Sequence, residues 1–223
     1  SYDVILEIFE ISKKQGIRSV DKICHRMELG KDTYTLGKIR PEMEEELCRV
    51  LADFVRIMEG YRVDDYRATA SSAISEASNS LYVLGKIHQL TGFSVTVLSN
   101  SEQRFLSYKA LAAMEDNFNK IIEKGTAILD LDGGSFQISL FDKDALVTTQ
   151  NIRMGSLRIR ERLAGIQSET EHYEEMVEEL IWNEVSSFKK MYLKDRKIEN
   201  IMLIGDVFTD SVYQNIEEKT TKI

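Results

Sequence analysis

The order of strands and helices along this chain limits its fold more than any other feature of the sequence. Short apolar runs such as "FSVTVLS" (93–99) and "IENIMLIGD" (198–206) have the length and composition of buried strands. Other segments space their apolar residues as a helix does, above all "RPEMEEELCRVLADFVRIMEGY" (40–61) and a long stretch over 169–194. The chain therefore alternates between the two kinds of element.

Near residue 120 this pattern starts again. Three successive strands with tight turns are predicted over residues 125–154, and a helix and a further strand follow them. Strands followed by helices, twice over, imply an α/β protein with two related lobes. We place the boundary between residues 122 and 123, which gives an N-terminal lobe, 1–122, and a second lobe, 123–223.

The charge and the apolar runs exclude some classes of partner. A formal net charge of −8 argues against a large surface for nucleic acid, although a local cationic pocket or a bridging metal ion stays open. The apolar runs are far shorter than the roughly 20 residues of a membrane helix. No signal-like segment opens the chain, and the two cysteines, Cys24 and Cys48, are expected to be reduced and mostly buried. We expect a cytoplasmic protein.

A glycine-containing stretch, "LDLDGGS" (129–135), is the first that indicates chemistry. Gly133 and Gly134 allow backbone N–H groups to approach phosphate oxygens, and Asp130 could hold a divalent cation. The same letters are typical of a simple hairpin turn, because Asp-Gly is a strong hairpin signal. Taken alone, the stretch favours the hairpin.

Two further stretches carry polar residues where a strand runs into a helix. "ASSAISEASN" (70–79) could offer hydroxyl and N–H groups to an anion, or could cap a helix with small residues. "VLSNSEQRF" (97–105) places Glu102 and Gln103 at a helix start, where open α/β sheets tend to bind ligands. There too, a capping box or a solvated first turn is an alternative.

These three stretches are followed by "RMGSLRIRERL" (153–163), and their order along the chain favours the functional interpretation over the simple structural ones. Together they resemble the exopolyphosphatase/guanosine pentaphosphate phosphatase (Ppx/GppA) family, whose pattern is roughly "ATSAxREAxN", "SGxEEA", "DIGGGSTE" and "LGAVRLTE". The resemblance runs from the first residues to about residue 165, with a weaker match at "IMLIGD". It implies the fold of the actin-like ATPase superfamily, α/β with two ribonuclease-H-like lobes and a cleft between them.

The resemblance also implies roles for single residues. Asp130 would help to hold Mg²⁺, and Glu102 would activate water. The family's catalytic base and its closing glutamate fall on Gln103 and Gln137. The positions that correspond to phosphate-binding ones are Ser71, Ser72, Ser75, Gly133, Gly134, Ser135 and Arg158.

Several positions differ from the family pattern, and each change weakens either proton transfer or phosphate binding. Gln103 and Gln137 are amides where carboxylates are expected, and an amide cannot take a proton from water near neutral pH. Ser75 replaces an arginine that could bind phosphate through two nitrogens. Asp132 replaces a glycine and adds negative charge to the presumed phosphate loop.

Two functions from different classes therefore stay open. One is a phosphatase that hydrolyses phosphoanhydride bonds of inorganic polyphosphate or guanosine pentaphosphate with Mg²⁺. The other is a catalytically impaired homologue, a pseudoenzyme that binds a phosphorylated ligand or a protein partner without hydrolysis. A sugar kinase or actin-like ATPase shares the fold but lacks support in the "SEQ" and "ASSA" stretches. A homodimer also stays open.

The ends of the chain depart from the family as well. The family opens with a strand and a loop, "DxGSNSF", whose last serine and aromatic residue correspond to Ser1 and Tyr2. Its metal-binding aspartate would then precede residue 1. Near the other end, "IGD" stands in place of a glycine pair, and no basic extension follows. We expect a fragment, and this puts processive handling of long polyphosphate in doubt.

Overall fold

The computed structural model describes residues 2–14, 16–165, 172–194 and 196–205. By its internal contacts the chain divides into two compact units, Ser1–Ser101 and Glu102–Ile223, which are described separately. The lobe boundary placed between residues 122 and 123 stays a prediction.

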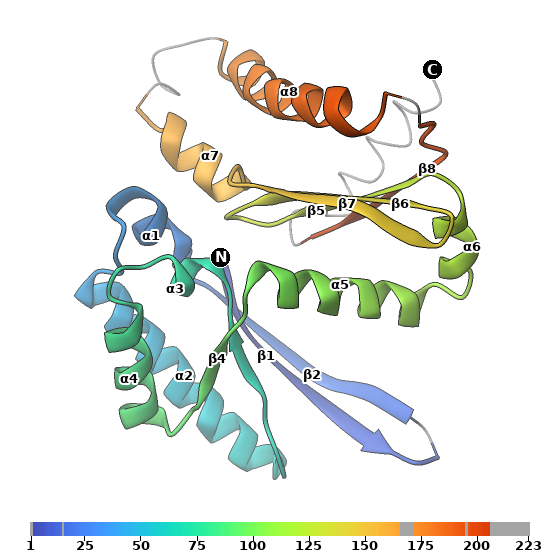
Figure 1. The fold of residues 1–223 in the computed structure, drawn as a ribbon. Coiled ribbons are helices and arrows are strands. Elements are labelled where there is room, and N and C mark those ends of the chain that lie inside the picture. The colour runs from blue at the N-terminus through green and yellow to red at the C-terminus, as the bar shows by residue number, and fades with distance from the viewer. Residues whose placement is uncertain (1, 15, 166–171, 195, 206–223) are drawn as a thin grey trace. The chain divides into compact units, whose positions relative to one another are not determined.

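The first unit contains two pairs of strands and the helices between them (Figure 1). Strands β1 and β2 form an antiparallel hairpin, and the short strands β3 and β4 pair in parallel. Its elements are β1 (Asp3–Ser12), β2 (Gly16–Arg26), α1 (Gly30–Leu36), α2 (Pro41–Tyr61), β3 (Ala68–Ala70), α3 (Ser72–Ser75), α4 (Ser80–Thr91) and β4 (Val95–Val97).

Helix α2 forms where the sequence predicts it. Pro41 occupies the first turn, where its missing N–H is not needed, and Glu42 and Glu44 place negative charge at the positive end of the helix. The helix passes Gly60, the predicted stop, and ends at Tyr61, because Arg62 takes the left-handed capping conformation with a φ of 55°. Its apolar face packs on α4, and the buried core of the unit includes Leu47, Val50, Phe54, Val83 and Ile87.

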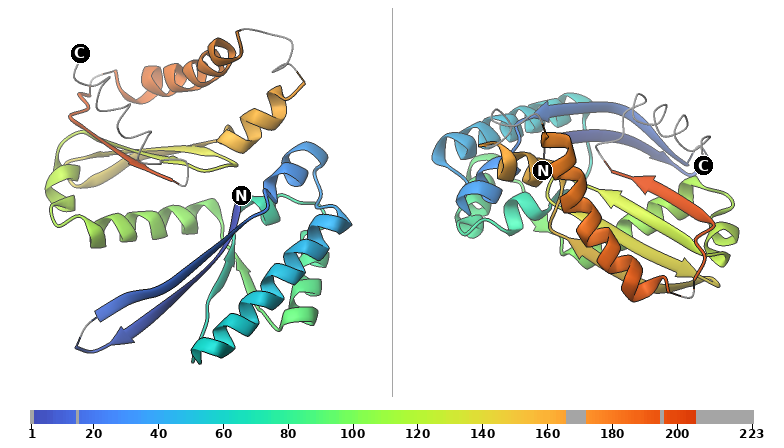
Figure 2. Two further views of the ribbon diagram at one scale, coloured as in Figure 1. Left: turned by 180° about the vertical axis from the view of Figure 1, so that it is seen from behind. Right: turned by 90° about the horizontal axis from the view of Figure 1, so that it is seen from above.

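The second unit is a four-stranded sheet with helices on both faces (Figures 1 and 2). The strand order is β7-β6-β5-β8, with β5 parallel to β8 and the other pairs antiparallel. The three successive strands predicted here are confirmed. The elements are α5 (Asn100–Met114), α6 (Phe118–Glu123), β5 (Thr126–Leu131), β6 (Phe136–Asp142), β7 (Ala145–Ile152), α7 (Ser156–Leu163), α8 (Tyr173–Tyr192) and β8 (Asn200–Ile204).

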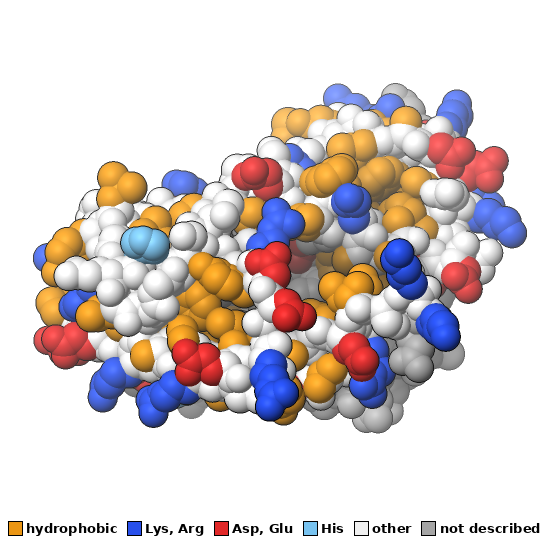
Figure 3. Space-filling view, turned by 90° about the horizontal axis from the view of Figure 1, so that it is seen from below, with side chains coloured by type: hydrophobic (Ala, Val, Ile, Leu, Met, Phe, Trp, Pro, Cys, Tyr) orange, Lys and Arg blue, Asp and Glu red, His pale blue; other side chains and the backbone are white. Residues whose placement is uncertain are grey.

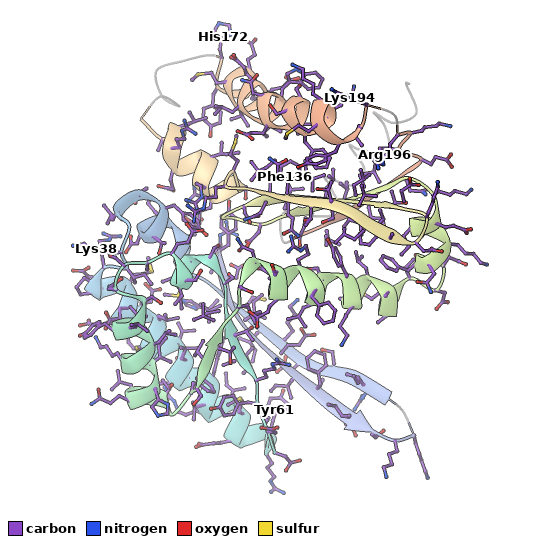
Figure 4. The ribbon with its side chains drawn as sticks, in the orientation of Figure 1. Lys38, Tyr61, Phe136, His172, Lys194 and Arg196 are labelled. Carbon is purple, nitrogen blue, oxygen red and sulfur yellow. The ribbon has the colours of Figure 1, made fainter. Side chains whose placement is uncertain are left out.

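Alternation along β6 supplies both faces of this sheet. Phe136, Ile138 and Leu140 point to one face, where they pack against Phe188 of α8. Figure 4 shows Phe136 between the sheet and that helix. The opposite face is covered by α5 and α6, and there Phe141 packs against Phe118 and Tyr108.

Some expectations about burial are corrected. Cys48 is buried as expected, but Cys24 lies exposed on the β1–β2 hairpin, which has no second layer over that side chain. The run 93–99 yields a strand of only three residues, Val95–Val97, and none of them is fully buried. The long helix predicted over 169–194 begins at Tyr173, and residues 169–171 lie outside the described part of the chain.

The surface mixes charges of both signs. In Figure 3, acidic, basic and apolar side chains are interspersed, and the described residues seen there form no continuous basic patch. Of the helices that the structure describes, none combines the length and the apolar character that crossing a membrane requires.

Candidate functional site

The stretch "DGGS" forms the turn between β5 and β6. The last residue pair of the ladder is Leu131 with Phe136, and within the turn the N–H of Asp132 donates to the carbonyl of Ser135 at 3.0 Å. The hairpin interpretation of this stretch is therefore confirmed. A hairpin turn can also bind an anion, so the outcome depends on where its backbone groups point.

The carbonyl groups of this turn point to the start of α7. Asp132 accepts from the N–H of Ser156 at 3.2 Å, and Gly133 accepts from the N–H of Arg158 at 3.0 Å. Gly134 accepts from Nε of Arg158 at 2.9 Å. Since three successive carbonyls are held by α7, the backbone of the turn has little freedom.

The N–H groups of the turn are partly used. The N–H of Gly133 donates to the carboxylate of Asp132, its own neighbour. Within the described residues, the N–H groups of Gly134 and Ser135 donate to no other group. Two adjacent donors on a fixed backbone can hold one anionic oxygen each.

Arg158 stabilises the β5–β6 turn, a role that the sequence did not predict. The sequence predicts it as a phosphate ligand, and its guanidinium does hold the Gly134 carbonyl. The side chain is half-buried, so it braces the turn from the side of α7. A role in binding phosphate stays a prediction.

Helix α5 is attached to the sheet by one hydrogen bond to each of three strands. The hydroxyl of Ser107 donates to Asp130 on β5 at 3.2 Å, and the hydroxyl of Tyr108 donates to Ser139 on β6 at 2.6 Å. Arg104 donates to Thr149 on β7 at 2.9 Å. Residues three and four apart share a helix face, so these three side chains fix the register of α5 on the sheet.

This register places Gln103 one helical turn from the contact between Ser107 and Asp130. Gln103 lies four residues before Ser107, hence one turn away on the same face of the helix. The side chain of Gln103 is half-buried, whereas Glu102 is exposed. The two candidate residues on α5 thus belong to the same unit, and to the same end of the sheet, as the β5–β6 turn.

Gln137 lies beside Asp130 in the sheet. The register pairs it with Asp130 on β5 and with Asn151 on β7. It points to the same face as Ser139, two residues along the strand, and so toward α5. Only 7% of the residue is exposed, and in the described residues its carboxamide makes no hydrogen bond.

The described carboxylates suit a Mg²⁺ site only if water and the phosphates of a ligand supply the remaining oxygen ligands. No cluster of three or more His, Cys, Asp or Glu side chains suited to a metal exists among the described residues. Asp130 is held in place by Ser107, and Asp132 lies two residues further on at the turn. One or two carboxylates, completed by water and by the phosphates of a ligand, are the usual protein contribution to a Mg²⁺ site.

Three of the four predicted serines, Ser71, Ser72 and Ser75, lie in the first unit, apart in sequence from the residues above. The carbonyl of Ser71 accepts the first hydrogen bonds of α3, from Ile74 and Ser75 at 3.0 Å each. Ser72 is buried, and its hydroxyl contacts the hydroxyl of Tyr34 at 2.8 Å. Ser75 is exposed at the end of α3.

The structure thus sorts the predicted residues into two sets. The second unit holds Glu102, Gln103, Asp130, Gly133, Gly134, Ser135, Gln137 and Arg158, and the first unit holds Ser71, Ser72 and Ser75. Sequence reasoning missed Arg104, Ser107 and Tyr108. Their spacing of three and four residues was the available signal, but such spacing is common on any helix.

The family follows from comparison with known proteins. The sequence model described as the Ppx/GppA phosphatase family matches residues 7–222, nearly the whole chain. The chain belongs to this family. The predicted membership is confirmed, and with it the α/β fold that the family's solved structures share.

The proteins that resemble the chain include a curated relative and several solved structures. The relative is a bifunctional 3-dehydroquinate synthase/phosphatase of Fusobacterium nucleatum, 21% identical over 211 residues. That match covers 91% of this chain and 30% of the relative. The chain therefore spans less than a third of that protein.

Among solved structures, a Ppx/GppA family member of Aquifex aeolicus is 21% identical, with a TM-score of 0.68. It matches 97% of this chain and 67% of its own. An exopolyphosphatase of Cytophaga hutchinsonii is 20% identical, with a TM-score of 0.70 over 100% of this chain and 69% of its own. At such identities the likeness shows the fold.

Proposed function

We propose that this protein is a Ppx/GppA-type phosphatase that hydrolyses phosphoanhydride bonds of inorganic polyphosphate or guanosine pentaphosphate. The observation that carries the proposal is the β5–β6 turn. Its carbonyls are held by α7, which leaves the N–H groups of Gly134 and Ser135 for an anion beside Asp130. Family membership supports the reaction class, and two of the similar proteins are named as a phosphatase and an exopolyphosphatase.

In this proposal each part of the site has one task. Asp130 holds Mg²⁺, which lowers the negative charge of the bound phosphates. Gly134 and Ser135 bind a terminal phosphate through their N–H groups, and Glu102 takes a proton from the attacking water. Roles in phosphate binding for Gly133 and Arg158, and for Ser71, Ser72 and Ser75 of the first unit, stay predictions. A cytoplasmic location stays a prediction, as does a homodimer.

A second candidate is a homologue that binds the same ligand, or a protein partner, without hydrolysis. The observation in its favour is Gln137, a buried amide that pairs with Asp130 in the sheet at a position where the family pattern has a glutamate. A carboxylate there would add charge to a Mg²⁺ site, and an amide does not. Gln103 also favours this candidate, since a carboxamide cannot act as the general base that hydrolysis needs.

Phosphate release separates the two candidates. The protein, its Glu102→Gln variant and the Gln103→Glu, Gln137→Glu double variant are incubated with each substrate and Mg²⁺. If the unmodified protein turns over and Glu102→Gln lowers the rate by about 10²–10⁴-fold, the phosphatase proposal is supported. If only the double variant turns over, the protein is a binding module on an intact scaffold.

Binding is measured on the same samples, so that a protein that binds without turnover is distinguished from one that has lost its binding site. Calorimetry with tripolyphosphate and Mg²⁺ reports affinity without turnover. A protein that neither binds nor hydrolyses either substrate contradicts the phosphatase and the ligand-binding homologue, and leaves a homologue that binds a protein partner.

A further inference from the structure

The hydroxyl of Ser107 on α5 contacts the carboxylate to which the proposed function gives the cation. It donates to Oδ2 of Asp130 at 3.2 Å, and the contact is partly buried between the helix and β5. Figure 1 shows α5 along one face of the sheet of the second unit, with α8 over the other face. Both residues belong to this one unit, so its own packing fixes their contact.

The backbone of Asp130 is fixed by the sheet around it. β5 is an inner strand, and Asp130 pairs with Gln137 of β6 on one side and with Ile204 of β8 on the other. Its side chain points to the face that α5 covers, as does Ile128, two residues earlier in the core on that face. What stays adjustable is the rotation of the carboxylate, and a hydrogen bond from Ser107 restricts this rotation.

The position of Ser107 is fixed as well, because polar contacts hold α5 on either side of it. Arg104, nearly one turn earlier, donates to Thr149 of β7 at 2.9 Å. Tyr108, the next residue, donates to Ser139 of β6 at 2.6 Å. The helix therefore cannot slide along the sheet, and the hydroxyl of Ser107 stays within reach of the β5 carboxylate.

Ser107 adds little to the attachment of α5 itself. Its side chain is small and half-buried, and 3.2 Å is a long distance for a hydrogen bond between two oxygen atoms. Tyr108 makes a shorter bond and also packs edge-to-face on Phe141. The attachment of the helix thus depends on Tyr108 more than on Ser107, whereas Ser107 is the residue that contacts Asp130.

Asp130 is isolated as a carboxylate at its level of the sheet. Across the four strands the residues paired at this level are Asn151, Gln137, Asp130 and Ile204, and Asp130 is the one acid among them. A cation held there depends on the orientation of this carboxylate more than a cation among several acids would. Carboxylates that bind metals are commonly held by hydrogen bonds, and loss of such a partner typically costs about 10–100-fold in metal affinity.

We propose that Ser107 is a positioning residue, which orients the Asp130 carboxylate for a divalent cation without touching the cation itself. This inference rests on the Mg²⁺ site of the proposed function. It gives α5 a second task in that site, besides carrying Glu102 and Gln103. The hydroxyl is the group that matters, so a side chain that keeps it keeps the effect.

Cation binding in the absence of substrate tests this, because it needs no turnover. The unmodified protein, Ser107→Ala and Ser107→Thr are titrated with Mn²⁺, which prefers the same oxygen ligands as Mg²⁺ and whose free ion is measured by electron paramagnetic resonance. Ser107→Ala should bind Mn²⁺ at least ~10-fold more weakly. Ser107→Thr keeps the hydroxyl and should bind Mn²⁺ as the unmodified protein does.

Tyr108→Phe is the matched control at the next residue. It removes a hydrogen bond that attaches α5 to β6 but leaves the hydroxyl of Ser107 in place, so Mn²⁺ affinity should stay unchanged. Ser187→Ala removes an exposed hydroxyl on α8, which donates to the carbonyl of Asn183, and should also change nothing. Urea unfolding of each variant shows that the affinities are compared between folded proteins.

Phosphate release by the same variants separates this inference from the proposed function. Weaker Mn²⁺ binding by Ser107→Ala alone supports the inference, even if no variant hydrolyses substrate and the phosphatase proposal fails. Unchanged Mn²⁺ binding by Ser107→Ala overturns the inference and leaves an active phosphatase untouched. An equal loss in Ser107→Ala and Tyr108→Phe overturns it too, because Ser107 would then act only by attaching α5. So does an unmodified protein that binds no Mn²⁺.

Discussion

Gly155 decides how closely α7 approaches the β5–β6 turn. A Cβ atom at this position would lie 2.3 Å from the carbonyl oxygen of Asp132 and 2.4 Å from the backbone of Gly133. Both contacts are backbone atoms, which cannot rotate aside. Gly155→Ala must therefore push α7 and the turn apart, and with them the contacts of Arg158.

We expect Gly155→Ala to lower the free energy of unfolding by about 2–4 kcal/mol and to weaken tripolyphosphate binding. Gly165→Ala is the matched control, since an added Cβ there meets no atom within 4 Å. Urea unfolding and calorimetry measure both effects. Equal stability and affinity in the two variants would mean that the turn does not depend on this close packing.

The ion pair between Glu44 and Lys86 predicts a pH dependence of stability. Lys86 Nζ lies 2.6 Å from Glu44 Oε1, and the carboxylate is buried. The hydrogen bond to Glu44 raises the pKa of Lys86 above its ordinary value of 10.5. Because this pKa is higher in the folded state, the stabilisation is complete below pH 10.5 and is lost as the pH rises through the folded pKa.

The free energy of unfolding should therefore fall above about pH 10.5, and it should fall less steeply in Glu44→Gln. Burial and the Glu44 carboxylate raise the pKa of the Cys48 thiol, which also titrates in the alkaline range, so both proteins are compared in a Cys48→Ala background. Urea unfolding at several alkaline pH values measures the slopes. Identical slopes would show that the ion pair does not stabilise the fold.

Helix α5 depends on its three polar contacts because its face toward the sheet contains no fully buried residue. Tyr108 makes the shortest of these contacts, and its partner Ser139 is 1% exposed. Tyr108→Phe keeps the edge-to-face packing on Phe141 but leaves the hydroxyl of Ser139 with only the longer contact to Thr149, at 3.3 Å.

We expect Tyr108→Phe to cost about 1 kcal/mol of unfolding free energy. Tyr82→Phe is the control, because Tyr82 is 66% exposed on α4 and its hydroxyl makes no hydrogen bond in the described residues. Chemical unfolding of the two variants gives the comparison. A loss of the same size in both would remove the argument that Tyr108 attaches α5 to the sheet.

Local patterns predicted the long elements of this fold well. The proline, the acidic first turn and the apolar spacing of α2 all act within a few residues, so they can be read directly. The tight turn predicted between the second and third of the three successive strands forms at Lys143 and Asp144, which take positive φ values of 52° and 58°. The short strands β3 and β4 were harder, because three residues carry too little pattern and pairing across the chain defines them.

The candidate site was predictable in its residues more than in its contacts. Asp130 and the glycines are recognised from letters in a row, and the structure places them at one turn. The bonds from α5 to three strands join residues 23 to 45 positions apart, so no local pattern could predict them. Arg158 shows the same limit, since its bond to Gly134 spans 24 positions.

On the scale of the whole molecule, net charge opposes the proposed ligand. The chain carries a formal charge of −8, and polyphosphate is a strong polyanion. At the turn, Asp130 and Asp132 add carboxylates of their own, whereas the Arg158 guanidinium is engaged with Gly134. Favourable binding therefore needs a cation between protein and phosphate, which is the task proposed for Mg²⁺.

The salt dependence of binding tests this argument. Added salt strengthens binding that like-charge repulsion opposes, and it weakens binding that Lys and Arg side chains provide. Repulsion between a protein and a ligand of like charge is screened as the Debye length shrinks from about 30 Å at 0.01 M to about 10 Å at 0.1 M salt. With the metal removed by chelation, tripolyphosphate should bind at least ~10-fold more weakly, and added salt should then strengthen the remaining binding. Asp132→Gly should reduce the dependence on Mg²⁺, since it removes one of the opposing charges. If salt instead weakens metal-free binding, as it does for proteins that neutralise phosphates with Lys and Arg, a local cationic pocket outweighs the net charge and Mg²⁺ is not what holds the ligand.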